Sequence, residues 1–143
     1  MPEQIALKIP KAVWHQMAEH ALEDAPREAV GLLGGPTVGV VHKIAPLPNL
    51  AGPLAFFADP YAQFNAEKAL RAESLIIVGY YHSHPGGGLA LSNEDRLFAS
   101  RRDWTYVLIA TGLHGERKVR TAAYRWLNND IREVPLILIP ATS

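Results

Sequence analysis

The clearest pattern of hydrophobic and polar positions lies between Pro10 and Pro26. Apolar side chains recur there at helical spacing, and polar side chains fall on the opposite side. The apolar stripe contains Val13, Trp14, Met17, Ala18, Ala21 and Leu22, and the polar side contains Gln16, Glu19 and Glu23. The pattern predicts an amphipathic helix that packs on the rest of the protein and ends before Pro26.

Short apolar runs separated by turn residues predict strands along the remaining chain. Residues 28–33 and 38–44 predict a hairpin whose turn is formed by Gly34, Gly35 and Pro36. Residues 45–58 contain three prolines, and we expect an irregular loop there. Residues 75–81 are nearly all apolar, which is typical of a central strand covered on both faces. Further strands are predicted at residues 106–110, 119–126 and 131–139, with turns around 112–115 and at 128–130.

Two more helices have recognisable starts. Asp59 precedes Pro60, so the carboxylate caps the free amides, proline takes the first helical position, and the helix continues to Arg71. Ser92 is suited to be the N-cap of a third helix that reaches about residue 101. Helices and strands mix without strict alternation. We therefore predict the α/β class, with one domain over residues 1–143 and a mixed β-sheet flanked by helices.

Composition narrows the classes of function. The chain has 143 residues, with 14 Lys and Arg against 14 Asp and Glu, and this balance argues against a nucleic-acid partner. It has no cysteine, which excludes disulfides, thiolate metal sites and a cysteine nucleophile. The longest apolar runs are far below the roughly 20 residues of a spanning helix, so we expect no membrane association and a cytoplasmic location. The apolar residues 134–139 either pair across a homodimer edge or lie in the core of a monomer, and we favour the core.

The residues that carry chemistry follow the central strand. His82 and His84 are two apart on an extended chain, so both imidazoles can point to one side. Asp95 falls at about the third position of the third helix, and the glycines at 86–88 allow that helix to fold back toward the histidines. Two imidazoles and one carboxylate leave a fourth position for water, which is the composition of a catalytic zinc site. We expect one Zn²⁺ per chain.

Each of these features has a plainer interpretation. A His-x-His pair arises by chance, and Ser92 with Asp95 is also an ordinary helix-capping pattern. The combination with Pro85 at fixed offsets favours the metal site over both. Hydrolysis also needs a base near the water, and Glu28 is the candidate because it opens an apolar strand. Taken by itself, Glu28 is better explained as a solvated strand end.

Taken together, these residues resemble the signature of the JAMM, or MPN-plus, zinc metalloprotease family in its small bacterial type. That signature is an upstream glutamate followed by His-x-His-Pro, six residues and Ser-x-x-Asp, and the chain matches it at every position. The stretches Glu28-x-x-Gly31-x-Leu33-x-Gly35 and Phe57-Ala58-Asp59-Pro60 are also similar to the family. The resemblance covers roughly residues 5–126. It implies an MPN, or cytidine-deaminase-like, fold and hydrolysis after the C-terminal Gly-Gly of a ubiquitin-like or sulfur-carrier protein.

The resemblance also implies a role for each site residue. His82, His84 and Asp95 would bind zinc, and Glu28 would take the proton of the attacking water and pass it to the leaving amine. Ser92 would donate its hydroxyl to the oxyanion, cap the helix, or do both. The neighbouring Ser83 and Pro85 are expected to shape the loop.

The chain departs from the family pattern at two points, and two other functions remain as alternatives. Val30 stands where small bacterial members often carry a non-ligand cysteine, and 143 residues leave no room for the insertions with which larger deubiquitinases grip ubiquitin chains. A zinc hydrolase of a small amide remains an alternative. So does a non-catalytic MPN scaffold that binds a ubiquitin-like partner, although the intact residue set argues against it.

Overall fold

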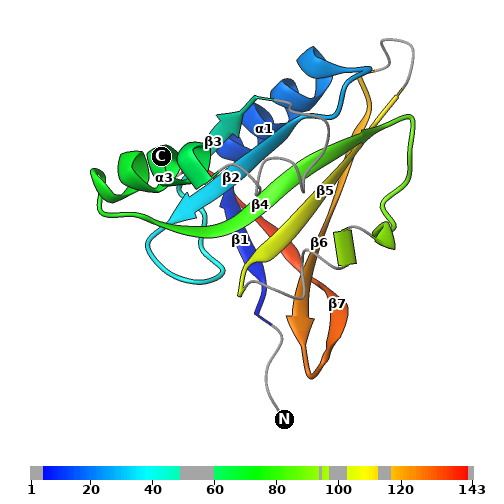
Figure 1. The fold of residues 1–143 in the computed structure, drawn as a ribbon. Coiled ribbons are helices and arrows are strands. Elements are labelled where there is room, and N and C mark those ends of the chain that lie inside the picture. The colour runs from blue at the N-terminus through cyan, green and yellow to red at the C-terminus, as the bar shows by residue number, and fades with distance from the viewer. Residues whose placement is uncertain (1–4, 49–59, 94, 97–102, 113–116, 142–143) are drawn as a thin grey trace.

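A six-stranded mixed sheet forms the centre of the computed structural model (Figure 1), which describes residues 5–48, 60–93, 95–96, 103–112 and 117–141. The strand order is β3, β2, β4, β5, β6, β7. Only β4 and β5 are parallel neighbours among these described strands, and the other pairs are antiparallel. The strands are β2 (Val30–Gly35), β3 (Lys43–Leu47), β4 (Ile76–Pro85), β5 (Thr105–Thr111), β6 (Val119–Leu127) and β7 (Asp130–Val134). The predicted α/β class with a mixed sheet is confirmed.

A second, two-stranded sheet pairs the two ends of the described chain. β1 (Leu7–Pro10) and β8 (Leu136–Ile139) run parallel, and the side chains of Leu7 and Ile9 are fully buried. β1 was not predicted from the sequence, and β8 was expected to continue β7 as one strand. The proline at position 135 separates the two strands because it lacks an N–H for the ladder. The core placement of 134–139 is wrong for three of these residues, because Ile137, Leu138 and Ile139 are 42%, 41% and 39% exposed.

Helix α1 (Lys11–Asp24) covers one face of the sheet. Its buried side chains, which include Val13, Met17 and Ala21, join a core with Val107 and Ile109 of β5. The predicted amphipathic helix is confirmed, and it ends before Pro26 as expected. Among the described residues, no helix combines the length and the apolar character that crossing a bilayer requires.

Helix α3 (Pro60–Arg71) packs beside β4. The prediction of this helix from Pro60 to Arg71 is confirmed, and its buried Leu70 lies against the backbone of Gly34. The proposed cap, Asp59, lies outside the described residues. Residues 113–115 of the turn predicted around 112–115, and most of the expected loop at 45–58, also lie outside the described residues.

The predicted hairpin is present, but its turn and second strand are shifted. The turn is formed by residues 37–40, where the N–H of Val40 donates to the carbonyl of Thr37 at 3.1 Å. Gly39 has a φ of 82° there, which a glycine adopts without strain. Gly34 and Gly35 belong to β2. β3 therefore begins only at residue 43, and it includes residues 45–47, which were expected in a loop.

The turn between β6 and β7 confirms its prediction. Asn128 and Asn129 have φ values of 52° and 62°, and they connect Leu127 to Asp130, which are register partners. A two-residue connection with two positive φ values matches the twist of an antiparallel pair.

Candidate metal centre

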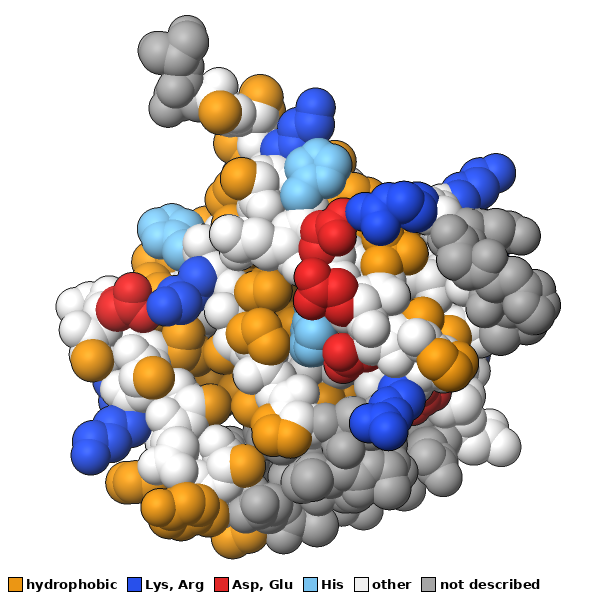
Figure 2. Space-filling view, turned by 90° about the horizontal axis from the view of Figure 1, so that it is seen from above, with side chains coloured by type: hydrophobic (Ala, Val, Ile, Leu, Met, Phe, Trp, Pro, Cys, Tyr) orange, Lys and Arg blue, Asp and Glu red, His pale blue; other side chains and the backbone are white. Residues whose placement is uncertain are grey.

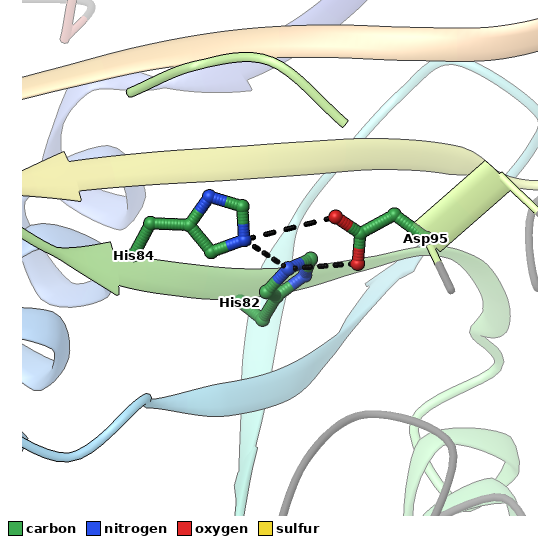
Figure 3. Close-up of side chains that lie close together, drawn as sticks. All are labelled: His82, His84 and Asp95. Carbon is green, nitrogen blue, oxygen red and sulfur yellow. Dashed lines mark hydrogen bonds and ion pairs between the residues drawn. The ribbon is translucent and has the colours of Figure 1, made fainter. Parts of the chain in front are cut away.

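Strand β4 carries both histidines and ends later than the sequence predicted. It continues past Tyr81 to residue 85, because β5 provides partners as far as Ala110 for His84 and Thr111 for Pro85. His82 and His84 therefore lie on one face of a paired strand, and their Nε2 atoms are 2.9 Å apart (Figure 3). The side chain of His82 is 1% exposed, and that of His84 is 19% exposed.

Asp95 approaches the histidines from the first turn of the third helix (Figure 3). The N–H of Asp95 donates to Ser92 Oγ at 3.1 Å, and the N–H of Ser92 donates to Asp95 Oδ2 at 2.8 Å. This reciprocal pair is a capping box formed with an aspartate. Ser92 is thus the N-cap, as predicted. The helix is described at Asn93, Asp95 and Arg96, and residues 97–101 lie outside the described chain.

The three side chains offer a compact set of metal ligands. Asp95 Oδ1 lies 3.1 Å from His82 Nε2, and Asp95 Oδ2 lies 3.7 Å from His84 Nε2. A tetrahedral zinc ion with bonds of about 2.0 to 2.1 Å requires ligand atoms about 3.3 Å apart. The observed separations of 2.9, 3.1 and 3.7 Å lie on either side of that value. The donor types and the spacing therefore both fit zinc.

Neighbouring hydrogen bonds and charges favour cation binding by these ligands. Burial raises the pKa of Asp95, but the hydrogen bond and charge of His82 and the two bonds to Ser92 outweigh burial and bring the pKa to about 2. The carbonyl of Gly88 lies 3.3 Å from His84 Nδ1 and can accept only from a protonated nitrogen. This contact favours the tautomer whose Nε2 lone pair faces the other two ligands.

Glu28 lies two residues before β2, the strand that pairs antiparallel with β4. Val30 is the register partner of His82. Beyond this pair, two hydrogen bonds join Ala29 and Ser83: the N–H of Ser83 donates to the carbonyl of Ala29 at 3.0 Å, and the N–H of Ala29 donates to Ser83 Oγ at 2.8 Å. Extending this register past Val30 and His82 would place the half-buried Glu28 opposite His84, and the charge of Glu28 acts on the buried phenol of Tyr80, two residues before His82. Ser83 was expected to shape the loop, but its hydroxyl ties the end of this strand pair.

The aromatic side chains that pack on His82 were not predicted from the sequence. The ring of Tyr80 packs on His82 with centroids 5.4 Å apart, and it also packs on Tyr106 at 5.4 Å. Burial raises the pKa of the Tyr80 phenol, and the charges of Asp95 and Glu28 add to the effect. The alternation Tyr80-x-His82-x-His84 was a usable signal, since residues two apart on a strand share a face.

Known proteins share both the fold and the motif-bearing part of this chain. A protein from Desulfitobacterium hafniense, solved in solution, is 30% identical, with a TM-score of 0.79 over 96% of this chain and 95% of its own. A structure described as a JAMM metalloprotease-like zinc site in the proteasome and signalosome matches with a TM-score of 0.61 at 19% identity, covering 94% of this chain and 98% of its own. The second likeness supports the fold.

Residues 10–126 match the family of prokaryotic homologs of the JAB domain, and the chain belongs to that family. A probable TtuB-protein conjugate cleaving protease from Thermus thermophilus is 38% identical over 109 residues, 75% of this chain and 72% of the relative. A desampylase from Haloferax volcanii is 30% identical, covering 81% of each chain. A CysO-cysteine peptidase from Mycobacterium tuberculosis is 28% identical, covering 86% of this chain and 84% of its own. The resemblance and the enzyme class predicted from the sequence are confirmed.

Proposed function

We propose that the protein is a zinc metallopeptidase that hydrolyses the peptide or isopeptide bond after the C-terminal Gly-Gly of a ubiquitin-like or sulfur-carrier protein. The observation that carries the proposal is the convergence of His82, His84 and Asp95, whose ligand atoms all lie within 4.8 Å of one another. A protein-conjugate substrate is supported by the relatives named for TtuB-protein conjugates and for CysO-cysteine.

His82, His84 and Asp95 would hold one Zn²⁺ per chain. When bound, the ion supplies a Lewis acid that polarises the scissile carbonyl and lowers the pKa of water from about 15.7 to about 7. Three protein ligands leave a coordination position for the reactants, as catalytic zinc sites require. The low pKa of Asp95, about 2, supports this role because the carboxylate is charged at every physiological pH.

Glu28 would act as the general base. Its carboxylate takes a proton from the attacking water and delivers it to the leaving nitrogen when the C–N bond breaks. The two bonds between Ala29 and Ser83 support this role, because they fix the backbone next to Glu28 relative to the strand of the histidines.

Ser92 would donate its hydroxyl to the oxyanion of the tetrahedral intermediate. Its oxygen already accepts the N–H of Asp95, and a hydroxyl that accepts a hydrogen bond still has its own proton to donate. Capping and oxyanion stabilisation are therefore compatible in one residue. Loss of a single oxyanion donor costs about 10² to 10³ in rate in other hydrolases.

The distribution of charge supports a protein substrate over a nucleic acid. On the face shown in Figure 2, basic side chains stand apart from one another among acidic and uncharged ones. A phosphate-backbone partner would favour a continuous basic surface.

The test is mass spectrometry of a ubiquitin-like sulfur carrier whose C-terminal Gly-Gly is extended by an amide-linked residue or peptide. We expect the zinc-loaded wild type to cleave after Gly-Gly, and Glu28→Gln, which keeps the size of the side chain, to retain zinc and lose cleavage. A free Gly-Gly amide serves as the second substrate. Equal turnover of the free amide contradicts the protein-substrate assignment, and absence of cleavage by a protein that holds zinc contradicts the proposed activity.

A further inference from the structure

The segment between the histidines and Asp95 needs external support to hold its shape. Residues 86–91 lie outside regular helix and strand and include three consecutive glycines. Glycine loses more conformational freedom on ordering than any other residue. The bonds that fix this loop therefore determine how closely Asp95 stays to His82 and His84.

The first half of the loop is held by β4 and β5. Gly86 donates its N–H to the carbonyl of Thr111 at 2.6 Å, and Gly87 donates to the carbonyl of His84 at 2.9 Å. Gly88 contacts His84 Nδ1 through its carbonyl. These contacts all precede the part of the loop that leads into Ser92.

The second half is held from β6. The hydroxyl of Tyr124 donates to the carbonyl of Leu89. Tyr124 is the register partner of Tyr106 and packs against the buried Tyr80 and Tyr106 cluster, of which Tyr80 lies on His82. A paired strand and a packed aromatic cluster thus fix the position of this hydroxyl, whereas the glycine-rich loop has neither.

A second observation connects Tyr124 to the start of the third helix. Burial and the charge of Glu133 raise the pKa of Tyr124, while the charge of Arg96 lowers it. Arg96 follows Asp95 directly and bonds through its N–H to the carbonyl of Ser92 at 3.0 Å. The charge of Arg96 therefore acts on the same phenol that is bonded to Leu89.

We propose that Tyr124 is a positioning residue whose hydroxyl anchors the loop at Leu89 and thereby keeps Asp95 in place to bind the metal. Tyr124 acts through the loop, without contact to the reacting atoms. The inference rests on the proposed metal site and adds to it a residue from a strand that contributes no ligand.

The test is the affinity for Zn²⁺ and Co²⁺, measured by competition with a chromogenic chelator. Tyr124→Phe removes only the hydroxyl, and we expect the dissociation constant to rise about 3- to 10-fold, the size of one net hydrogen bond. At saturation, the Co²⁺ absorption spectrum should match that of the wild type, because the ligands are unchanged. The matched control is Tyr81→Phe, which removes a tyrosine hydroxyl bonded to His20 Nδ1 at 2.7 Å on the opposite face of the sheet. That control should lower stability and leave the dissociation constant unchanged.

A second variant tests the same loop independently. A Cβ added at Gly88 meets no atom within 4 Å, and Gly88 is not among the described glycines with positive φ. Gly88→Ala should therefore stiffen the loop without strain, tighten metal binding about 2-fold, and recover part of the loss caused by Tyr124→Phe. Unchanged affinity in Tyr124→Phe, or an equal loss in Tyr81→Phe, overturns the inference and leaves the proposed function standing. A wild type that binds neither ion overturns both.

Discussion

Replacement of Gly31 by alanine tests why β2 needs a glycine three residues after Glu28. Gly31 is the register partner of Tyr81, and a Cβ at Gly31 would lie 2.4 Å from Cε1, Cζ and the hydroxyl of that ring. Ordinary contact between carbon atoms is about 3.5 to 4.0 Å, so the ring would have to move by about 1 Å or more. It has little freedom to do so, because Tyr81 is fully buried and its hydroxyl is bonded to His20.

The expected loss of stability follows from the burial of Tyr81 and from its bond to His20. Overpacking a buried site costs about 1 to 3 kcal/mol, and losing the bond to His20 costs about 1 kcal/mol more. We expect Gly31→Ala to lower the free energy of unfolding by about 2 to 4 kcal/mol in urea, and to lower Tm by roughly 6 to 16 °C. Metal affinity should also fall, because Val30 is the register partner of His82.

A double-mutant cycle provides the control. In a Tyr81→Leu background the ring is absent, and Gly31→Ala should then cost less than about 1 kcal/mol. If the alanine costs as much in that background as in the wild type, contact with the ring is not the reason for the glycine. A midpoint within experimental error of the wild type would refute the reasoning altogether.

Three further outcomes are expected. Gly79→Ala should destabilise severely, since its Cβ would lie 2.4 Å from the backbone carbonyl oxygen of Thr105 in the paired strand, and soluble expression and circular dichroism measure the loss. Ser92→Ala should lower kcat by about 10²-fold or more and the free energy of unfolding by about 0.5 to 2 kcal/mol. If stability falls but kcat is unchanged, Ser92 caps the helix and takes no part in oxyanion stabilisation. The lowered pKa of Asp95, about 2, means that its carboxylate stabilises the metal-free fold above about pH 4, and that this contribution is lost as pH falls through about 2. Asp95→Asn should therefore be less stable than the wild type in urea titrations at about pH 6, with the difference shrinking toward pH 2, and a constant difference would argue against the attraction to His82.

The candidate ligands could be proposed from the sequence because local geometry relates most of them. His82 and His84 share a face on any extended strand, and Ser92 with Asp95 forms a cap on any helix start. The spacing alone did not establish that the histidine pair and the helix start contact each other. That contact depends on the path of the glycine-rich loop and on Tyr124, which lies in a strand distant in sequence.

The errors in the fold have physical causes of their own. Gly34 and Gly35 suggested a turn, but their missing side chains make room for Leu70 and for the backbone of Val40. The actual turn uses Gly39, where a positive φ is required. β1 was missed because four residues give too little periodicity to detect, and its partner β8 lies at the other end of the described chain.

The parallel pairing of β1 with β8 also bears on how the protein forms in the cell. Leu7 and Ile9 are synthesised before Leu136–Ile139, whose backbone groups complete their ladder. During synthesis, the edge of β1 that faces β8 has no ladder partner until residues 136–139 have been made, whereas its other edge can already bond to Gly39 and Val41. Closure of this small sheet therefore comes after the earlier strands have been made, and a chain interrupted before Leu136 would leave one edge of β1 open to pairing with another strand.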